Sequence, residues 1–284
     1  MQDIVDFIAN MSSGQKLAWI FICLSFNWII EAISPLFKFD YQKLKHIGVN
    51  LVFLSTDLLI NVLFTLATVG VFAWIGEHNI GLLNMIELPM WAELLIAVLA
   101  LDLCAQYFAH YMLHTIPFMW RFHMIHHSDT HVDATSATRH HPGDYVCREI
   151  FALGAVFVFG IPLAFYLFYR ILTVFFAYWS HANISMPKWI EVPISYVLVT
   201  PDMHKFHHHF ERPWTDTNFG NIFSIWDRMF GTLTYDDPKK IQYGLDMLPS
   251  ERSQDILYQY SVPFRSDVKT DPDKNWLGMQ RKKK

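Results

Sequence analysis

The chain has 284 residues, of which 52% are hydrophobic and 17% charged, and its formal net charge is −4. Soluble domains are usually less apolar and more highly charged, and the mild negative charge gives no reason to expect a nucleic acid or another polyanion as partner. Cys23, Cys104 and Cys147 lie far apart and form no Cys-x-x-Cys pair, which argues against a disulfide framework and an iron–sulfur cluster. The composition therefore favours an integral membrane protein.

Four apolar stretches are long enough to cross a hydrocarbon layer, which takes about 20 residues at helical rise. They run roughly over 17–37, 47–75, 85–109 and 149–179. Residues before the first stretch are acidic and polar and do not resemble a cleaved signal peptide, so that stretch is expected to remain as an anchor.

The fourth apolar stretch has Gly160, Ile161 and Pro162 near its middle. A proline inside a helix breaks or kinks it, so this stretch is predicted to form a hairpin of two short helices. The expected fold class is an all-α integral membrane protein with about four transmembrane helices, the hairpin included, and a histidine-rich helical cap.

Loop charge predicts the orientation of the chain. The loop after the first stretch carries Lys38, Lys43 and Lys45, whereas the loop at 76–89 has no lysine or arginine. Because basic loops tend to stay in the cytoplasm, the cap is expected on the cytoplasmic side, at a bacterial inner membrane or the endoplasmic reticulum. We expect one domain over 1–284, with a histidine-rich core at 100–235 and a polar C-terminal tail at 236–284.

Histidine is concentrated in one part of the chain. Thirteen of the 15 histidines lie between residues 110 and 209, while His46 and His78 lie near segment ends and are expected to face solvent. In "HYMLH", His110 and His114 are four residues apart at the end of the third stretch, so they share one helical face and can bind one metal ion.

Two further motifs share a second spacing, in which one histidine precedes an adjacent pair by three and four positions. Neighbouring residues on a helix point about 100° apart, so one member of each pair can reach one metal ion while the other reaches a second. These motifs are "HMIHH", with His123, His126 and His127, and "HKFHH", with His204, His207 and His208.

The ligand types narrow the choice of metal. Eight imidazoles from three helical segments are too many for one ion but suit two. Structural zinc sites commonly use cysteine, calcium and magnesium prefer oxygen ligands, and imidazole also suits iron and copper. We expect two iron ions, with zinc as the second choice and as a metal that a purified sample can contain.

The order of these motifs, interleaved with apolar spans, resembles the fatty acid hydroxylase/sterol desaturase superfamily of membrane di-iron enzymes. Further pieces are similar to that family: "RHHP" at 139–142, "SHANI" at 180–184, "DTNFG" at 216–220 and "WDRMFGT" at 226–232. The likeness is detailed over about 100–235, and within the superfamily the last motifs are nearest to the sterol desaturase and alkylglycerol monooxygenase branches.

The resemblance implies a set of metal ligands and an activity. The implied activity is oxidation of a lipid (a sterol, a fatty acyl chain or an ether lipid) by O2 and external electrons, as hydroxylation or desaturation. His209 is expected to be a neighbour of the last motif only. The implied ligands are His110, His114, His123, His126, His127, His181, His204, His207 and His208, with His141 as a tenth candidate.

Three polar residues are candidates for supporting the ligands. Asp102 lies in an apolar stretch, where a carboxylate is costly and usually has a partner. It is predicted to accept a hydrogen bond from a ligand imidazole, which would orient the ring; a helix-interface acid with another donor is the alternative. Asp216 and Asn218 are expected to do similar work, and a plain turn at "DTN" is equally consistent with their sequence.

The sequence contains no nicotinamide, flavin or Rossmann pattern, so electrons are expected from a separate donor such as a ferredoxin or a cytochrome b-type protein. Arg121, Lys205 and Arg212 would give a basic face on which an acidic donor docks. The lipid substrate is expected to arrive from the bilayer.

Two other classes of function stay open. A zinc-dependent membrane hydrolase would need a glutamate beside the histidines, as in His-Glu-x-x-His, and these motifs have none. A metal transporter or non-catalytic metal-binding membrane protein would place its ligands inside the spans, along a path, whereas these motifs adjoin the ends of the spans.

Overall fold

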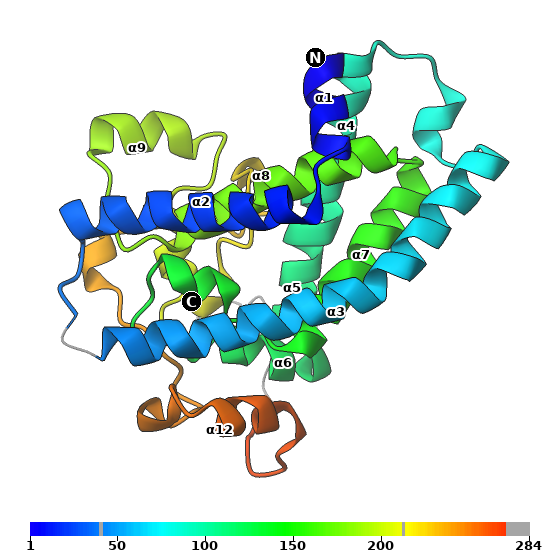
Figure 1. Ribbon diagram of the computed structural model, residues 1–284. Helices are drawn as coiled ribbons and strands as arrows, with labels where there is room; N and C mark the ends of the chain where they lie inside the picture. The colour runs from blue at the N-terminus through cyan, green and yellow to red at the C-terminus, as the bar shows by residue number, and fades with distance from the viewer. Residues whose placement is uncertain (40–41, 212–213, 271–284) are drawn as a thin grey trace, which may run out of the picture.

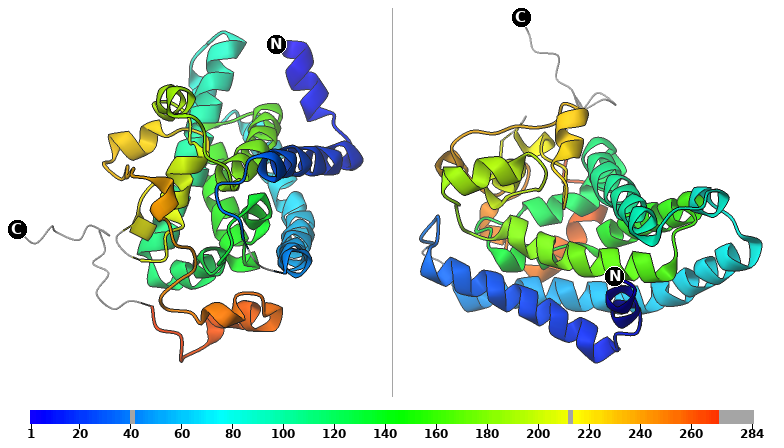
Figure 2. Two further views of the ribbon diagram at one scale, coloured as in Figure 1. Left: turned by 90° about the vertical axis from the view of Figure 1, so that its left-hand side faces the viewer. Right: turned by 90° about the horizontal axis from the view of Figure 1, so that it is seen from above.

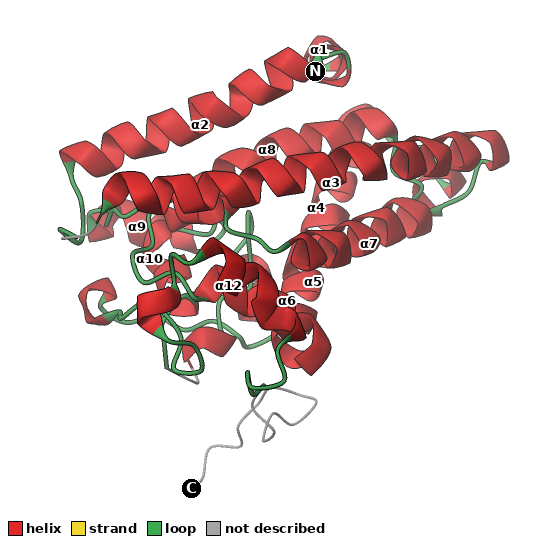
Figure 3. Ribbon diagram, turned by 60° about the horizontal axis from the view of Figure 1, so that its bottom comes forward, coloured by secondary structure: helices red, strands yellow, loops and turns green. Residues whose placement is uncertain are grey.

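The computed structural model describes residues 1–39, 42–211 and 214–270. Within these residues the regular elements are helices, and the only β pairing is an isolated bridge between Leu198 and Phe223 (Figure 3). The predicted all-helical fold class is confirmed.

The α-helices are α1 (Gln2–Ala9), α2 (Ser13–Ile33), α3 (Lys43–His78), α4 (Met90–Leu101), α5 (Ala109–Thr115), α6 (Pro117–His127), α7 (Pro142–Phe159), α8 (Leu163–His181), α9 (Lys188–Ser195), α10 (Pro201–His207), α11 (Ile225–Met229) and α12 (Ile256–Ser261). The short helical turns are η1 (Leu82–Met85), η2 (Asp102–Phe108), η3 (Ala134–Thr138), η4 (Trp214–Asp216), η5 (Pro238–Lys240), η6 (Ser250–Arg252) and η7 (Val262–Phe264).

Four segments are long and apolar enough to cross a membrane, as predicted. They are Ser13–Ile33, Lys43–Met85, Met90–Thr115 and Leu163–His181. The first of them is α2, which begins with a capping box between Ser12 and Gln15, so its first backbone donors have acceptors before the apolar run begins.

The predicted hairpin in the fourth apolar stretch is confirmed. Helix α7 ends at Gly160, which has a left-handed φ of 67°, and α8 begins directly after Pro162. A β-carbon on Gly160 would lie 2.5 Å from the Ile80 carbonyl oxygen, so glycine serves both the turn and the close approach of the neighbouring loop. Only α8 of this pair qualifies as a membrane span.

The packing of the long helices fixes where the histidines can meet. Helix α8 contacts α1, α2, α4 and α10, while α3 lies along α7 (Figure 1). Two further views show α2 alongside α8 and α4 crossing α8 (Figure 2). Because α5 packs on α6 and the end of α8 packs on α10, the histidine-bearing segments converge at one end of the bundle.

The third span is not a uniform α-helix. Helices α4 and α5 are joined by η2, a π-helical stretch over Asp102–Phe108. A π-helical turn is wider than an α-helical turn and is frequent at functional sites. It shifts the register between Asp102 and His110, which the sequence alone places on a common face.

The C-terminal segment differs from the expected polar tail. Its described part, up to residue 270, places Leu245, Leu248, Tyr258, Val262 and Val268 in a cluster with residues of α3 and α6, among them Phe53 and Trp120. These apolar residues are widely spaced among polar ones, so composition hides them, and burial against α3 and α6 makes 236–270 part of the folded body. Residues 271–284 lie outside the described residues.

Candidate metal centre

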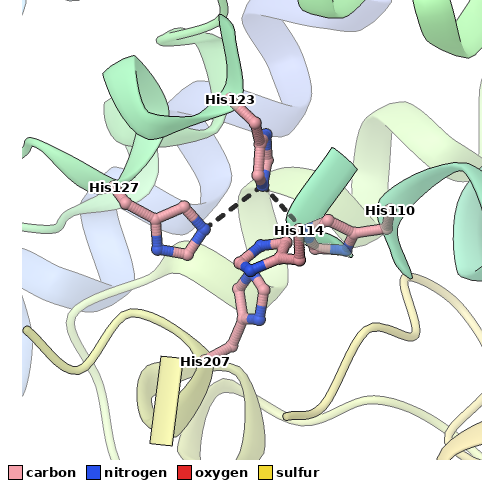
Figure 4. A group of neighbouring side chains, drawn as sticks. All are labelled: His110, His114, His123, His127 and His207. Atoms are coloured by element: carbon pink, nitrogen blue, oxygen red, sulfur yellow. Dashed lines mark hydrogen bonds between the residues drawn. The ribbon is translucent and has the colours of Figure 1, made fainter. Parts of the chain in front are cut away.

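Nine of the ten predicted ligands come together in two adjacent clusters. In each cluster the candidate ligand atoms lie within 4.8 Å of one another, and each of the nine side chains is at most 6% exposed. Cluster A contains His110, His114, His123, His127 and His207 (Figure 4), and cluster B contains His126, His181, His204 and His208.

The adjacent histidine pairs divide between the clusters as the spacing predicts. On α6, the rings of His126 and His127 are at 89° to each other and belong to different clusters. At the end of α10, His207 and His208 are at 90° and are divided in the same way. The rings of His127 and His208 lie 4.7 Å apart between centroids, so the two clusters are immediate neighbours.

Ring nitrogens converge inside each cluster. In cluster A, Nε2 of His123 lies 3.0 Å from Nε2 of His110 and 3.2 Å from Nε2 of His127. In cluster B, Nε2 of His181 lies 3.0 Å from that of His126 and 3.1 Å from that of His204. Nitrogens of several neutral rings aimed at a common point are the arrangement that a shared metal ion requires.

The hydrogen-bond partners of Nδ1 decide the tautomer of three of these rings. Nδ1 of His110 donates to the Phe219 carbonyl oxygen at 2.9 Å, and Nδ1 of His181 to the Ala177 carbonyl at 2.7 Å. Nδ1 of His207 donates to the Thr217 carbonyl at 2.8 Å. A carbonyl only accepts, so Nδ1 carries the hydrogen and the Nε2 lone pair faces the cluster, as a metal ligand requires. In His207, this Nε2 is buried and has no hydrogen-bond partner.

Burial keeps His123, His127 and His207 neutral. Burial lowers the pKa of His123 to about 4, although the neighbouring Asp144 carboxylate raises it. Burial also holds the pKa values of His127 and His207 well below the ordinary value. At neutral pH these rings are therefore unprotonated, so their lone pairs are free for a metal ion. The donor set thus fits two metal ions that prefer nitrogen.

Asp144 is a supporting residue that the sequence analysis missed. Its carboxylate accepts from Nδ1 of His123 at 2.6 Å, from Nδ1 of His140 at 3.0 Å and from Nε of Arg148 at 2.8 Å. Although burial raises the pKa of Asp144, Arg148 and His123 lower it more and hold it well below its usual range. The sequence signal for this residue was an acid two residues after "RHHP", at the start of a helix.

His141, the tenth candidate, lies outside both clusters, and this prediction is wrong. His141 is the residue before α7, with extended backbone angles, and its Nδ1 accepts from the Gly143 N–H at 3.0 Å. This capping role turns the ring toward Phe122, 5.1 Å away between centroids. His140 instead stacks on His126 of cluster B at 4.3 Å.

His209 and His46 lie outside both clusters. The side chain of His209 is bonded to Gln242 and lies away from the clusters, as expected of a neighbour. The expectation that His46 faces solvent is wrong, because it is fully buried in α3 and its Nε2 lies 2.9 Å from Asp129. Helix α3 begins at Lys43, three residues before His46, so His46 lies within the first turn of a helix and not in a loop.

Asp216 has the predicted supporting contact, since its Oδ1 lies 3.1 Å from Nδ1 of His114.

Asn218 has a different role from the one predicted. Its φ is 53°, its amide group donates to the carbonyls of Met203 and Thr234, and its oxygen accepts from the Thr234 N–H. Asn218 therefore forms the turn and holds the backbone of α10, without contacting a ligand ring.

The prediction that Asp102 accepts from an imidazole is wrong. Its oxygens accept from the Tyr169 hydroxyl, the Trp226 indole and the backbone N–H groups of Ile222 and Phe223. The π-helical register directs the carboxylate toward the loop after Phe219. Asp102 thus supports the segment whose carbonyl orients His110.

The two described residues of the predicted basic docking face, Arg121 and Lys205, are hydrogen-bonded within the fold. Lys205 is 1% exposed and donates to the carbonyls of Ala182 and Ile184. Arg121 donates to backbone carbonyls of the C-terminal segment, including that of Val268 at 2.9 Å. Both cations bind the protein's own backbone, and Arg212 lies outside the described residues.

Comparison with known proteins places these motifs in a family. The sequence profile of the fatty acid hydroxylase family matches residues 94–232, which include every histidine of both clusters. Over these residues the chain is similar to the fatty acid hydroxylase family. The resemblance of the histidine motifs is thereby confirmed.

Two similar curated proteins have names that describe lipid hydroxylation or oxygenation. The chain is 29% identical over 158 residues to ornithine lipid hydroxylase OlsE of Rhizobium tropici, covering 56% of this chain and 46% of that protein. It is 28% identical over 145 residues to alkylglycerol monooxygenase of Homo sapiens, covering 49% of this chain and 30% of that one. The match therefore spans less than half the length of these relatives. No solved structure matches the chain.

Proposed function

We propose that this chain binds two iron ions, one in each histidine cluster, and hydroxylates a membrane lipid. The observation that carries the proposal is the set of Nδ1–carbonyl bonds of His110, His181 and His207, which leaves each Nε2 lone pair aimed into a cluster. The family resemblance and the names of the relatives support oxidation of a lipid over the other chemistries that a histidine-bound metal can perform.

The overall reaction balances as RH + O2 + 2 electrons + 2 H⁺ giving ROH + H2O. When bound, the iron pair would supply the activation of O2 and the oxidation of an unactivated C–H bond. The residues of the chain hold the metal pair and keep water out. Trp120 and Phe219 support the second role, because both are at most 1% exposed and their rings lie against His114.

The substrate is proposed to reach the site from the bilayer. Two of the segments of membrane-crossing length carry cluster histidines at their ends, because Met90–Thr115 contains His110 and His114 and Leu163–His181 ends at His181. The relatives are named for a lipid and for an alkylglycerol. We further propose a cytoplasmic location for the site, from the lysines of the loop after α2, and a separate electron donor such as a ferredoxin or a cytochrome b-type protein.

The test is oxygen transfer into lipid. Iron-loaded, chemically reduced protein is incubated with membrane lipids of its host under ¹⁸O2, and the lipids are analysed by mass spectrometry. We expect a lipid product with one ¹⁸O atom, and its loss in His207→Ala and His181→Ala. His209→Ala is the matched control and should keep the activity. Iron-loaded protein that consumes no O2 with any of these lipids would overturn the proposal.

A further inference from the structure

Helix α9 lies at one edge of the molecule (Figure 1), and the fold leaves one of its faces uncovered. Trp189, Val192 and Tyr196 are spaced three and four residues apart, which places them on one side of a helix. They are 78%, 44% and 60% exposed, while Glu191 and Ser195 of the same helix are buried. An exposed group of aromatic and branched apolar side chains marks a surface that contacts a membrane or a protein.

Helix α11 extends this face of α9. The Arg228 guanidinium donates to the Ser195 carbonyl oxygen at 3.0 Å and lies over the Tyr196 ring, 4.7 Å from its centroid. The Ser224 hydroxyl, at the residue before α11, donates to the same carbonyl oxygen at 2.7 Å. These contacts join the two helices into one surface, which we call the α9–α11 surface. Its exposed apolar residues are Trp189, Val192, Tyr196, Val197, Met229 and Phe230.

The α9–α11 surface is continuous with a segment of membrane-crossing length. The Phe230 ring stacks on Tyr107, 5.1 Å away between centroids, and lies 5.4 Å from the Phe108 ring. Both partners belong to the 26-residue segment Met90–Thr115, which is longer than a ~30 Å hydrocarbon core requires. Phe108 is about 10 Å before the end of this segment at helical rise. Phe230 therefore lies near the depth at which acyl chains give way to headgroups.

The exposed charges of α9 and α11 are positive. Lys188 and Arg228 are exposed, whereas the acids of these two helices, Glu191 and Asp227, are 1% and 0% exposed. Lysine and arginine beside exposed tryptophan and tyrosine on an amphipathic helix are typical of the interface of an anionic membrane. An acidic partner protein would match these charges but not the position of Phe230 against the membrane-length segment.

We propose that the α9–α11 surface lies in the interfacial layer of an anionic phospholipid bilayer, with its apolar side chains among the acyl chains and Lys188 and Arg228 at the phosphates. The proposal does not depend on the metal chemistry of the clusters. Helix α10, which carries His204 and His207, begins four residues after Val197. The membrane contact thus holds the cap against the bilayer beside a helix of the metal centre.

The first test is the depth of Trp189, in the full chain reconstituted into vesicles of equal parts phosphatidylglycerol and phosphatidylcholine. Bromine atoms on the acyl chains quench tryptophan fluorescence at short range, and the difference between the parent and Trp189→Phe isolates the signal of this side chain. We expect bromines near the headgroup end of the chains to quench it at least about twofold more than bromines near the methyl end, because interfacial side chains reach only ~5–10 Å into the bilayer.

Two further variants complete this test. Trp214→Phe removes a half-buried tryptophan of the cap and is the matched control, because the signal it removes should not be quenched. The double variant Trp189→Phe/Val192→Trp moves the probe to a second position of the same face and should regain the quenching. A tryptophan that stays unquenched at both positions would overturn the proposal and leave the surface to water or to a protein.

The second test concerns the charge of the lipid. In the same mixed vesicles the bromines are placed either on phosphatidylglycerol or on phosphatidylcholine, so that the composition stays constant. We expect the brominated phosphatidylglycerol to quench Trp189 more strongly, and this difference to disappear in Lys188→Gln/Arg228→Gln. Lys239→Gln, at an exposed position, is the control and should keep the difference. Equal quenching of Trp189 by the two brominated lipids in the parent chain would overturn the assignment to an anionic bilayer.

Discussion

The chemistry of single rings decides whether the clusters can hold metal. Cluster membership alone would be compatible with a network of histidines bonded to one another. The carbonyl partners of His110, His181 and His207 require the hydrogen on Nδ1, so Nε2 of these rings offers a lone pair to the cluster. Such bonds lie outside the ligand shell, yet they set the orientation and basicity of the ligands.

Asp144 is the carboxylate with the shortest contact to a ligand ring, at 2.6 Å from His123. We predict that Asp144→Leu weakens metal binding in cluster A by roughly 10–100-fold, the usual effect of losing such a partner. Chelator competition on the purified variant measures this. Asp267→Leu, at an exposed position, serves as control, and equal metal affinity in both variants would refute the role.

The neutral histidines also predict how the metal-free protein responds to acid. The ordinary pKa is 6.5 and the folded pKa of His123 is about 4, so below pH 6.5 the unfolded chain binds protons that the folded chain does not. Stability should be constant above that pH and fall between 6.5 and about 4, by about 1.4 kcal/mol per pH unit for each such histidine. Thermal unfolding of metal-free protein at pH 7.5 and 5 measures it. Equal stability at the two pH values would contradict the buried, neutral state.

At the scale of elements, periodicity explains what the sequence could predict. The i, i+3 and i+4 spacings place His123 and His126 or His127 correctly, because α6 and α10 are regular. The spacing fails at the ends and irregularities of helices: Asp102 is turned by the π-helical stretch, and His141 is used as a cap. The burial of His46 depends on Asp129, 83 residues away, and no local pattern contains that pairing.

Asp102 supports the segment around residues 222–226 and not a ligand imidazole. Four donors from Tyr169, Ile222, Phe223 and Trp226 converge on its carboxylate. We predict that Asp102→Leu destabilises the protein by about 1–3 kcal/mol or more, because buried donors lose their acceptor. The change is read as a lower thermal midpoint in detergent, with Glu87→Leu in an exposed loop as control. A variant as stable as the parent would rule out this role.

Lys205 joins the end of α8 to α10. Its ammonium group donates to the carbonyls of Ala182 and Ile184, directly after His181. We predict that Lys205→Met loosens His181 and lowers the metal content toward one ion per chain, with cluster A retained. Quantitative metal analysis distinguishes this from general unfolding, which would remove both ions. Full occupancy in this variant would show that cluster B does not need the link.

At the scale of the whole molecule, helices far apart in the sequence meet where the long helices end. The apolar stretches predicted the membrane-length segments, and the motifs predicted the cluster residues. The sequence did not reveal that residues 245–268 pack beneath α3 and α6, because their apolar side chains follow no single helical or strand period.

The central claim is that two neighbouring histidine clusters each hold one iron ion. The most direct measurement is the iron content of the full chain after anaerobic reconstitution and removal of loosely bound metal, for the parent, His207→Ala and His181→Ala. The account predicts two iron ions per chain in the parent and a loss in each variant. At most one ion in the parent, or two ions retained in both variants, would contradict it.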